Sequence, residues 1–410
     1  MPDRDERDAL LAAQDCRALV ILADTSRDPY LAPFIGSARL SQALIVAPRE
    51  NVARLAYFTP MERLEAANAG LPLLTPEELD VERWARHGAS PAEIQAHTLS
   101  RALQILGLAP PSGNRLALTG RLPAGHAGEV SSRLAAEGWS FIGGEEIVER
   151  LRKRKAPHEV TEVQRVAAAT GEAFRAVTRL LVAADQRDGE LWLGGERLRA
   201  RRLTSEIYRT LSGHGLEQPE GLLVALGADG AVPHTTSDPD RVLRAGEPVV
   251  VDIFPRGRLF ADCTRTFCYG PPPTELAEAH RAVLEALEIA YTATRPGRLG
   301  WEIQQTVCEH FHLTGYPTPI SAPGTTQGYV HGLGHGVGYE VHEYPSFREH
   351  AGDEGRLRND DVFTLEPGLY HPENGWAVRL EDTVHLEDDL PVRLTDLPYD
   401  LDPRAWLDST

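Results

Sequence analysis

The stretch HGLGHGVGYEVHEYP, residues 331–345, places three histidines and four glycines in one short segment. A helix would put His331 and His335 on one face, as in the HExxH pattern of zinc peptidases. Position 332 is glycine rather than glutamate, however, and the alternating glycines make a helix costly. A phosphate loop is disfavoured because no Lys-Ser/Thr pair and no helix start follow. We therefore expect an extended segment in which His331 and His335 point the same way, with His342 further along.

Histidines need partners for chemistry, and four acids follow apolar runs elsewhere in the chain. Asp252 ends the run VVVD, and Asp262 lies ten positions later, across a turn at Pro255–Gly257. Glu366 follows VFTL, and Glu381 follows VRL fifteen positions later. Antiparallel strands joined by a turn can bring such positions side by side. We therefore predict strands that contain the four acids, two within 246–267 and one each over 361–370 and 376–386.

Carboxylates in apolar strands need neutralisation, since their desolvation costs several kcal/mol. A salt bridge is the simple explanation for any single acid, and Arg258, Arg265 and Arg379 are available. For four converging acids that explanation weakens, because one or two divalent cations neutralise several carboxylates at once. A histidine of the 331–345 stretch would complete the set of ligands.

The remaining pattern predicts two domains, as the length of 410 residues allows. Short apolar runs over 17–24, 42–48, 53–58 and 115–120 predict strands, and segments near 60–70 and 91–106 predict helices. Together they indicate a small α/β domain. The basic cluster and proline in VERLRKRKAPHEV, residues 148–160, indicate a boundary and a new helix. Residues 274–291 predict a helix capped by Thr274 and ended by Pro296–Gly297.

Composition excludes several classes of partner. The net charge is −18, which argues against binding nucleic acid or anionic membrane surfaces and against a nucleic-acid role for the 148–160 cluster. The start of the chain is charged and lacks an apolar core, so we expect no signal peptide. No apolar run is long enough for a transmembrane helix. The four cysteines form no CxxC pair, which favours a reducing, cytoplasmic location. We expect no nucleic-acid and no membrane partner.

Taken together, these motifs resemble one metallopeptidase family, which includes methionine aminopeptidase, aminopeptidase P and prolidase. The matching segments, in the order of the family, are VVVDIF with DCTRTF, HGLGHGVG with VHEYP, TLEPGLY, and VRLEDTV. The resemblance implies an α+β protein. A catalytic domain of pita-bread fold would span 151–410, and a smaller creatinase-like α/β domain would span 1–150. The run with HExP is especially similar to the proline-specific branch.

Carried over residue by residue, the resemblance implies a centre of two divalent cations. Asp262 and Glu381 would bridge both ions, Asp252 would hold the first, and His335 and Glu366 would hold the second. Such a hard ligand set favours Mn²⁺, although Co²⁺ or Zn²⁺ could occupy it. The two aspartates are one residue closer in sequence than is usual in the family, which puts the local register in question.

The resemblance also implies how the centre would work. The cations would activate a water and polarise the scissile carbonyl, and Glu366 would pass the proton of the water to the leaving nitrogen. His234 and His342 match histidines that contact the substrate near the scissile bond, and His342 can hydrogen-bond the carbonyl or the leaving group. His331 matches a histidine of the proline-side pocket. Arg379 and Tyr370 match a supporting pair beside the metal carboxylates. Cys263 and Cys268 are interpreted as packing residues.

The implied function is hydrolysis of the Xaa-Pro bond, most simply in dipeptides by a prolidase that acts as a homodimer. The alternative is aminopeptidase P, which releases the first residue of longer peptides. A dipeptidase must bind a free carboxylate, for which Arg27, Arg39 and Arg348 are unranked candidates. Two remoter alternatives are a metal-free creatinase-like hydrolase and a non-enzymatic peptide-binding module. Both are disfavoured because those branches have lost metal ligands, whereas all five are present here. Methionine aminopeptidase activity is disfavoured by the N-terminal domain and the HExP run.

Overall fold

The computed structural model describes residues 2–110 and 115–407. The chain divides into two compact units, unit one over Met1–Arg152 and unit two over Lys153–Thr410. No helix in the described ranges is long and apolar enough to cross a membrane.

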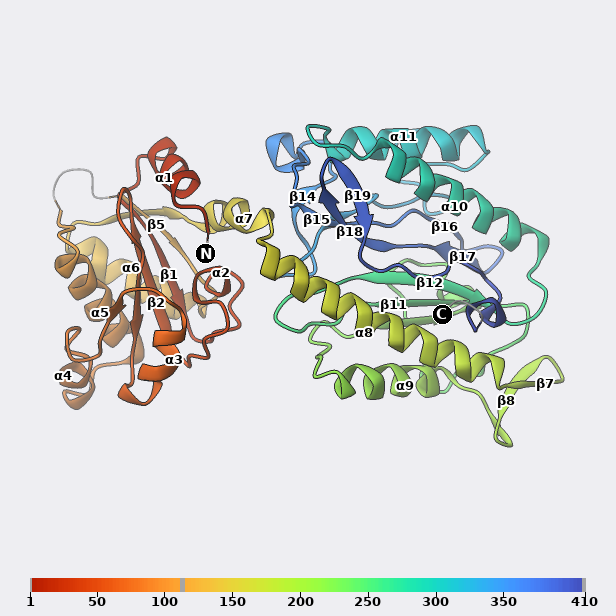
Figure 1. Ribbon diagram of the computed structural model, residues 1–410, viewed down its shortest axis with the longest axis horizontal. Helices are drawn as coiled ribbons and strands as arrows, with labels where there is room; N and C mark the ends of the chain where they lie inside the picture. Colours follow the sequence, from red (N-terminus) through yellow and green to blue (C-terminus); the bar gives the residue numbers. More distant parts are fainter. Residues whose placement is uncertain (1, 111–114, 408–410) are drawn as a thin grey trace. The chain divides into compact units, whose positions relative to one another are not determined.

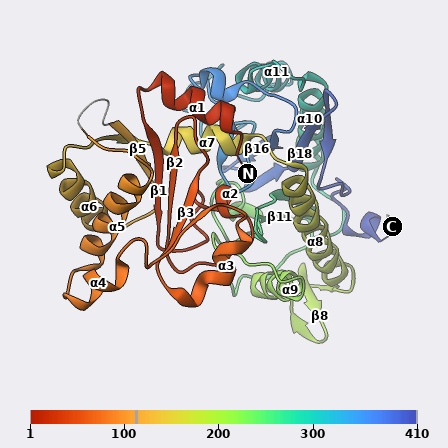
Figure 2. The ribbon, with the colours of Figure 1, turned by 60° about the vertical axis from the view of Figure 1, so that its left-hand side comes forward.

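Unit one is a mixed sheet between two layers of helices (Figures 1 and 2). The strand order is β4-β3-β2-β1-β5-β6. Its strands are β1 Ala18–Ala23, β2 Ala43–Pro48, β3 Arg54–Tyr57, β4 Leu73–Leu74, β5 Arg115–Thr119 and β6 Ser140–Gly143. Its helices are α1 Arg4–Ala13, α2 Ala32–Ile35, η1 Pro60–Glu62, α3 Arg63–Asn68, α4 Val81–Arg86, α5 Pro91–Ile105, α6 Ala124–Ala136 and α7 Glu145–Lys153, which ends at the first residue of unit two.

Both faces of this sheet are buried, as a continuous apolar run such as β1 requires. Leu19 and Ile21 belong to the core shared with α1, α2 and α7, whereas Val20 and Leu22 belong to the core shared with α5 and α6. The strands predicted from the runs over 17–24, 42–48, 53–58 and 115–120 are therefore all present, as is the helix predicted over 91–106.

Unit two packs curved antiparallel sheets between helices (Figure 1). Its helices are α8 Pro157–Val182, α9 Ala200–Gly213, η2 Gly227–Asp229, α10 Thr274–Ala293, α11 Gly300–Leu313, η3 Gly352–Gly355 and η4 Pro403–Trp406. Its strands are β7 Asp185–Arg187, β8 Glu190–Leu193, β9 Glu196–Arg197, β10 Leu223–Leu226, β11 Pro248–Ile253, β12 Cys263–Cys268, β13 His335–Gly336, β14 Glu343–Ser346, β15 Val362–Leu365, β16 Gly368–His371, β17 Trp376–Arg379, β18 Asp382–Glu387 and β19 Leu390–Arg393.

Three sheets of unit two carry the residues of interest: β10-β11-β12, β14-β13-β15-β18-β19, and β16-β17. Helices α10 and α11 contribute Leu287 and Phe311 to a core shared with Phe363 and Val384 of the five-stranded sheet. The helix predicted from Pro157 begins there. The predicted cap of α10 was wrong: its N-cap is Pro273, Thr274 is its first residue and its side chain makes no capping bond. The helix also ends at Ala293, before Pro296–Gly297.

Two predicted strands are broken in the structure, each at a glutamate. Residues 361–370 form β15 and β16, interrupted at Glu366–Pro367, because proline has no N–H to donate to a sheet. Residues 376–386 form β17 and β18, interrupted at Leu380–Glu381. There the Glu381 N–H donates to the carbonyl of Thr264 in another sheet, 3.0 Å away. Both glutamates therefore lie where the chain passes from one sheet to the other.

Candidate metal centre

The five predicted ligands come from five places in unit two. Asp252 lies within β11, and Asp262 directly precedes β12. His335 begins β13, and Glu366 and Glu381 occupy the two strand breaks. The prediction that all four acids lie inside strands was therefore wrong for three of them. Residues at strand ends are free of the alternation that fixes side chains to one face of a sheet, so these three can point into a common space.

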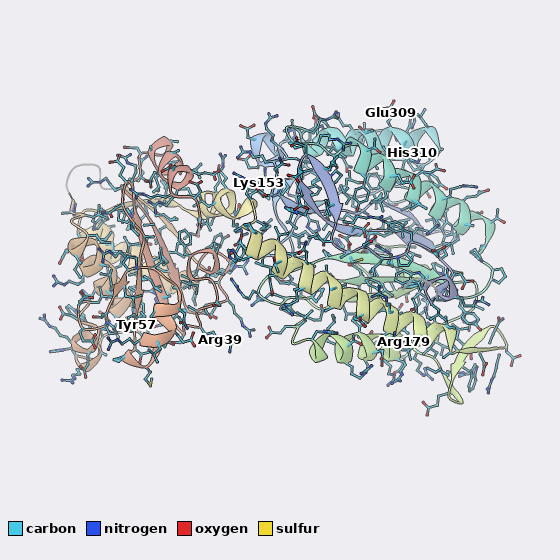
Figure 3. The ribbon with its side chains drawn as sticks, in the orientation of Figure 1. Arg39, Tyr57, Lys153, Arg179, Glu309 and His310 are labelled. Atoms are coloured by element: carbon cyan, nitrogen blue, oxygen red, sulfur yellow. The ribbon has the colours of Figure 1, made fainter. Side chains whose placement is uncertain are left out.

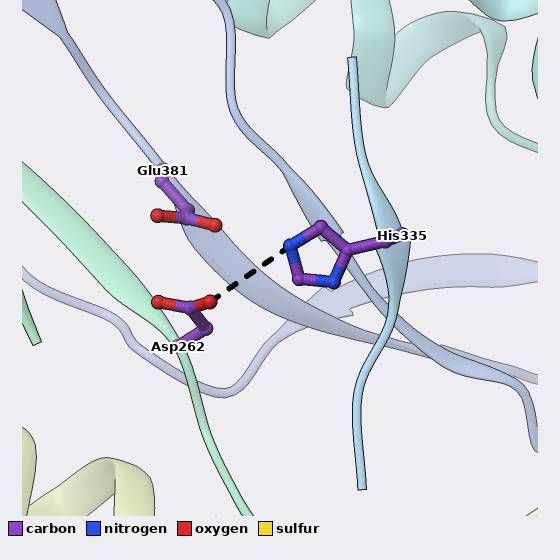
Figure 4. A group of neighbouring side chains, drawn as sticks. All are labelled: Asp262, His335 and Glu381. Atoms are coloured by element: carbon purple, nitrogen blue, oxygen red, sulfur yellow. Dashed lines mark ion pairs between the residues drawn. The ribbon is translucent and has the colours of Figure 1, made fainter. Parts of the chain in front are cut away.

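Three of these side chains approach one another closely (Figure 4). Asp262, His335 and Glu381 each offer a ligand atom, and these atoms lie within 4.8 Å of one another. The Nε2 atom of His335 lies 3.8 Å from Oδ2 of Asp262, the pair joined by the dashed line in Figure 4, and 3.4 Å from Oε1 of Glu366. Four of the five predicted ligands thus form one cluster, with three carboxylates around the imidazole.

Asp252 joins the site through an arginine. Its Oδ2 accepts a hydrogen bond of 2.6 Å from Nη2 of Arg379, which lies at the end of β17. The same guanidinium donates from Nη1 to the hydroxyl of Tyr370 at 2.8 Å and from Nε to the hydroxyl of Thr264 at 3.1 Å. Arg265, the other buried arginine considered for the acids, pairs instead with Asp382 at 2.7 Å. Arg379 is therefore the cationic partner of Asp252.

Burial, together with repulsion between the carboxylates, raises the pKa values of three of these acids. Burial, followed by the charges of Glu381, Asp252 and Glu366, raises the pKa of Asp262 well above its usual range. Burial and the same kind of repulsion raise the pKa of Glu381. Burial raises the pKa of Glu366 to about 8, with Asp252 adding to it and Arg379 opposing it. The raised pKa values mean that the ionised carboxylates are disfavoured in this site, and bound cations would stabilise them.

These residues fit divalent cations on two further observations. Among the described residues, Oδ1 of Asp252 and Oδ1 of Asp262 are buried oxygens without a hydrogen-bond partner. Unpartnered buried oxygens are costly, and a bound ion would satisfy them. The donor set, carboxylates with one imidazole, is the hard type that suits Mn²⁺ and related ions.

His335 is presented to this cluster as a neutral ligand. Its Nδ1 lies 3.1 Å from the carbonyl oxygen of Gly336, which places a proton on Nδ1 and leaves Nε2 as a lone pair toward the acids. Burial, followed by the charge of His342, lowers the pKa of His335 to about 3. Its backbone N–H donates to the hydroxyl of Thr364 at 3.2 Å, which fixes the start of β13. The segment is extended or turned rather than helical, as predicted from its glycines.

The other histidines lie around the cluster at different depths. His331 is half-buried, and its Nε2 lies 3.0 Å from the hydroxyl of Tyr370. Burial, followed by Arg379, lowers its pKa to about 4. His342 is exposed, and its ring centroid lies 4.2 Å from that of His335. His234 is exposed, and its charge lowers the pKa of His342 after the larger effect of burial.

Two threonines support the cluster and were not singled out from the sequence. The hydroxyl of Thr264 donates to Oε2 of Glu381 at 2.7 Å. The hydroxyl of Thr383 donates to the carbonyl of Asp262 at 2.8 Å and accepts the N–H of the same residue at 2.9 Å. Each threonine stands two positions after a candidate ligand, in DCT and EDT. That repeated spacing is the only sign of these threonines in the sequence. Their hydrogen bonds to the distant ligands are seen only in the tertiary structure.

Comparison with known proteins places this cluster in context. Residues 161–388 match the model of metallopeptidase family M24. The Xaa-Pro dipeptidase of Pyrococcus furiosus is 31% identical over 202 residues, which cover 48% of this chain and 53% of that protein. The match therefore spans about half the length of that relative.

Solved structures agree with the fold over nearly the whole chain. The prolidase from Pyrococcus horikoshii has a TM-score of 0.73 at 22% identity, covering 97% of this chain and 99% of its own. The X-Pro aminopeptidase from Thermotoga maritima has a TM-score of 0.71 at 23% identity, covering 98% and 99%. The predicted fold class, an α+β pita-bread protein with a smaller N-terminal α/β domain, is confirmed by this likeness.

Proposed function

The chain belongs to metallopeptidase family M24, and from this premise we propose that it hydrolyses the Xaa-Pro bond of dipeptides. The observation that carries the proposal is the convergence of Asp262, His335, Glu366 and Glu381 on one space, with Asp252 held beside it by Arg379. In this proposal residues 151–410 form the catalytic domain and residues 1–150 an accessory one.

We propose these five residues as the ligands of two divalent cations, and we propose that both ions are Mn²⁺. When bound, such cations supply Lewis-acid activation of water and of the substrate carbonyl. Manganese is favoured because four of the five ligands are carboxylates. Asp262 and Glu381 would hold the cations from the most buried part of the site, because they are the two most buried of the four candidate acids, at 4% and 2% exposure.

Proton transfer and substrate binding would be carried out by side chains of the protein. Glu366 is the candidate that accepts the proton of the attacking water and delivers it to the leaving nitrogen, because its Oε1 lies 3.4 Å from Nε2 of His335, inside the cluster. His342 is exposed beside His335 and can donate a hydrogen bond to the substrate carbonyl or leaving group. His234 would contact the substrate from its own loop, whose Pro233 carbonyl accepts a hydrogen bond of 3.4 Å from Arg379. His331 would shape the proline-side pocket together with Tyr370.

The alternative within the same site is aminopeptidase P, and the difference is whether a free carboxylate is required. Arg348 lies in unit two, and its charge contributes to the lowered pKa of His342. This proximity favours Arg348 over Arg27 and Arg39 as the group that binds the carboxylate of a dipeptide. A proline residue in the second position has no amide hydrogen and a rigid ring, so its binding depends on shape and on such a charge.

Parallel assays of Ala-Pro, Ala-Pro-Ala and Ala-Ala with Mn²⁺ test the substrate assignment. We expect cleavage of Ala-Pro, little cleavage of Ala-Pro-Ala and none of Ala-Ala. Preference for the tripeptide would move the function to aminopeptidase P, and preference for Ala-Ala would remove proline specificity. A homodimer and a cytoplasmic location complete the proposal. The latter is supported by the four cysteines, all free and buried.

A further inference from the structure

The basic run Arg152–Lys155, which the metal centre leaves unexplained, has three buried side chains and one exposed side chain, that of Arg154. The side chain of Arg154 is 53% exposed and pairs with Asp360. Lys153, labelled in Figure 3 at the end of α7, and Lys155 are almost completely buried. A buried lysine must have a partner. Lys153 and Lys155 are therefore internal features of unit two rather than parts of a solvated patch.

Lys155 reaches a glutamate in the histidine-rich segment. Its Nζ lies 2.7 Å from Oε1 of Glu343, and both side chains are 0% exposed. The same Nζ donates to the carbonyl of Lys153 at 2.9 Å. The other carboxylate oxygen of Glu343 accepts the backbone N–H of Glu340 at 3.2 Å. The ion pair thus also holds the turn that precedes Glu343.

Glu343 is joined to both histidines of the cluster. It follows His342 directly, and in the β13–β14 ladder it pairs with Gly336, the neighbour of His335. The rings of His335 and His342 lie 4.2 Å apart, centroid to centroid. A shift of Glu343 would therefore move one histidine through the chain and the other through the ladder.

Gly338 shows how closely this segment lies over the ion pair. A Cβ atom at this position would come within 2.4 Å of Cε of Lys155 and 2.8 Å of Oε1 of Glu343. The carbonyl of Gly338 accepts the N–H of Phe260 at 2.7 Å, two residues before Asp262. The segment over 335–343, called here the histidine hairpin, is therefore held by contacts with the pair and with the chain that carries Asp262.

We propose that Lys155 and Glu343 are positioning residues that set the separation of His335 and His342. The pair touches neither substrate nor cation, and it acts by fixing the histidine hairpin on which both imidazoles stand. The role in catalysis rests on the proposed peptidase function, whereas the role in ordering the hairpin does not. The basic run that looked like a surface patch in the sequence would thus be an internal support of the site.

Hydrogen exchange of the metal-free protein tests the ordering role without any activity. In Glu343→Gln the lysine loses its countercharge, and we expect amides of residues 336–343 to exchange at least tenfold faster than in the wild type. Lys153→Met is the matched control, because Lys153 is also buried and paired, with Asp361 at 3.6 Å, but bonds to the 356–361 segment. We expect the control to leave exchange of the hairpin unchanged.

Kinetics on Ala-Pro test the catalytic consequence. We expect Glu343→Gln to lower kcat at least tenfold while KM changes less than threefold, and Lys153→Met to change neither beyond twofold. If Glu343→Gln does not fold, the double variant Lys155→Met with Glu343→Gln buries no unpaired charge and takes its place. A folded double variant with wild-type exchange and wild-type kcat would overturn the proposal. A wild type inactive on every Xaa-Pro peptide would refute the peptidase function, while the exchange result would still decide the ordering role.

Discussion

The buried Arg379 pairs with the half-buried Asp252, with Nη2 and Oδ2 2.6 Å apart, and the guanidinium uses its other nitrogens for Tyr370 and Thr264. Three separate acceptors demand the planar fork of arginine, which an ammonium cannot reproduce. Breaking a buried pair by removing one partner costs about 3–5 kcal/mol. We therefore expect Arg379→Met to lose about 3 kcal/mol of unfolding free energy, and Arg379→Lys to recover only part of it.

Denaturant unfolding of the metal-free protein measures both variants, and kcat/KM for Ala-Pro gives the functional counterpart. Both variants should lower kcat/KM by at least about tenfold, which corresponds to about 1.4 kcal/mol. Full activity in Arg379→Lys would show that only the charge matters and that the fork does not.

The raised pKa of Glu366 predicts an unusual pH dependence for the metal-free protein. Burial raises this pKa from 4.5 to about 8, so between these values the folded state binds more protons than the unfolded state. The free energy of unfolding should then fall as the pH rises through this window, by up to about 1.4 kcal/mol per pH unit for this group. Burial also raises the pKa of Asp262 and Glu381, which adds to the same trend.

Urea unfolding at several pH values between about 6.5 and 8 checks this trend in the presence of a chelator, above the range in which the lowered pKa values of His331 and His335 act in the opposite direction. Glu366→Gln is the control, since it cannot ionise and should flatten the slope. A stability that rises with pH across the same window, and equally in the variant, would contradict the assigned burial and repulsion.

Cation binding should stabilise the folded state through the buried acids. At about 100 times the dissociation constant, a ligand that binds only the folded state adds about 2.7 kcal/mol. We expect Mn²⁺ to raise the melting temperature of the wild type and to bind at two ions per chain. Asp262→Asn should bind fewer than two ions and show a smaller shift.

Thermal melts with and without Mn²⁺, together with metal analysis after dialysis, measure both quantities. Asp229→Asn is a suitable control, because Asp229 pairs with Arg241 rather than with the cluster. Equal stoichiometry in Asp262→Asn and the wild type would remove Asp262 from the ligand set.

His342 should contribute to the chemical step rather than to metal binding. It is exposed beside His335 and has no assigned place among the ligands. A positioned proton donor contributes typically about 10²–10⁴-fold, so we expect His342→Ala to lower kcat by about 10²-fold while two Mn²⁺ ions still bind. His312→Ala, an exposed histidine of α11, serves as the control and should retain wild-type kcat. Loss of bound metal in His342→Ala would instead make it a ligand.

Arg348 should distinguish dipeptides from longer substrates. If its guanidinium binds the free carboxylate of Ala-Pro, Arg348→Ala should raise KM for Ala-Pro by about 10-fold or more, as expected for a lost charge-assisted hydrogen bond of about 1.5–3 kcal/mol. KM for Ala-Pro-Ala should change less, because its carboxylate lies one residue further away. Parallel changes for both substrates would exclude this role.

The sequence was sufficient for much of the fold, because burial on one or both faces of an element leaves a local pattern. The apolar run over 17–24 predicted β1, and the spacing of apolar residues over 274–291 predicted α10. The breaks at Glu366 and Glu381 were missed, since nothing local to VRLEDTV shows that the Glu381 N–H pairs with Thr264, more than a hundred residues earlier.

The candidate site was predictable for the residues that the family resemblance supplies, and the structure brings three of the predicted acids together around His335. The supports of the site were not predictable in the same way. Thr264, Thr383 and the Lys155–Glu343 pair owe their roles to contacts between distant strands and segments. A basic run such as 152–155 has the same composition whether its lysines face water or a buried glutamate, so only the tertiary structure distinguishes the two.

Hydrolysis of Ala-Pro by metal-stripped protein, before and after addition of Mn²⁺, shows whether the cleavage depends on two bound cations. We expect no measurable cleavage by the stripped protein and recovery of cleavage as two equivalents of Mn²⁺ are bound. Cleavage that persists in the stripped protein, or its absence when two ions are bound, would contradict an Xaa-Pro dipeptidase built on Asp252, Asp262, His335, Glu366 and Glu381.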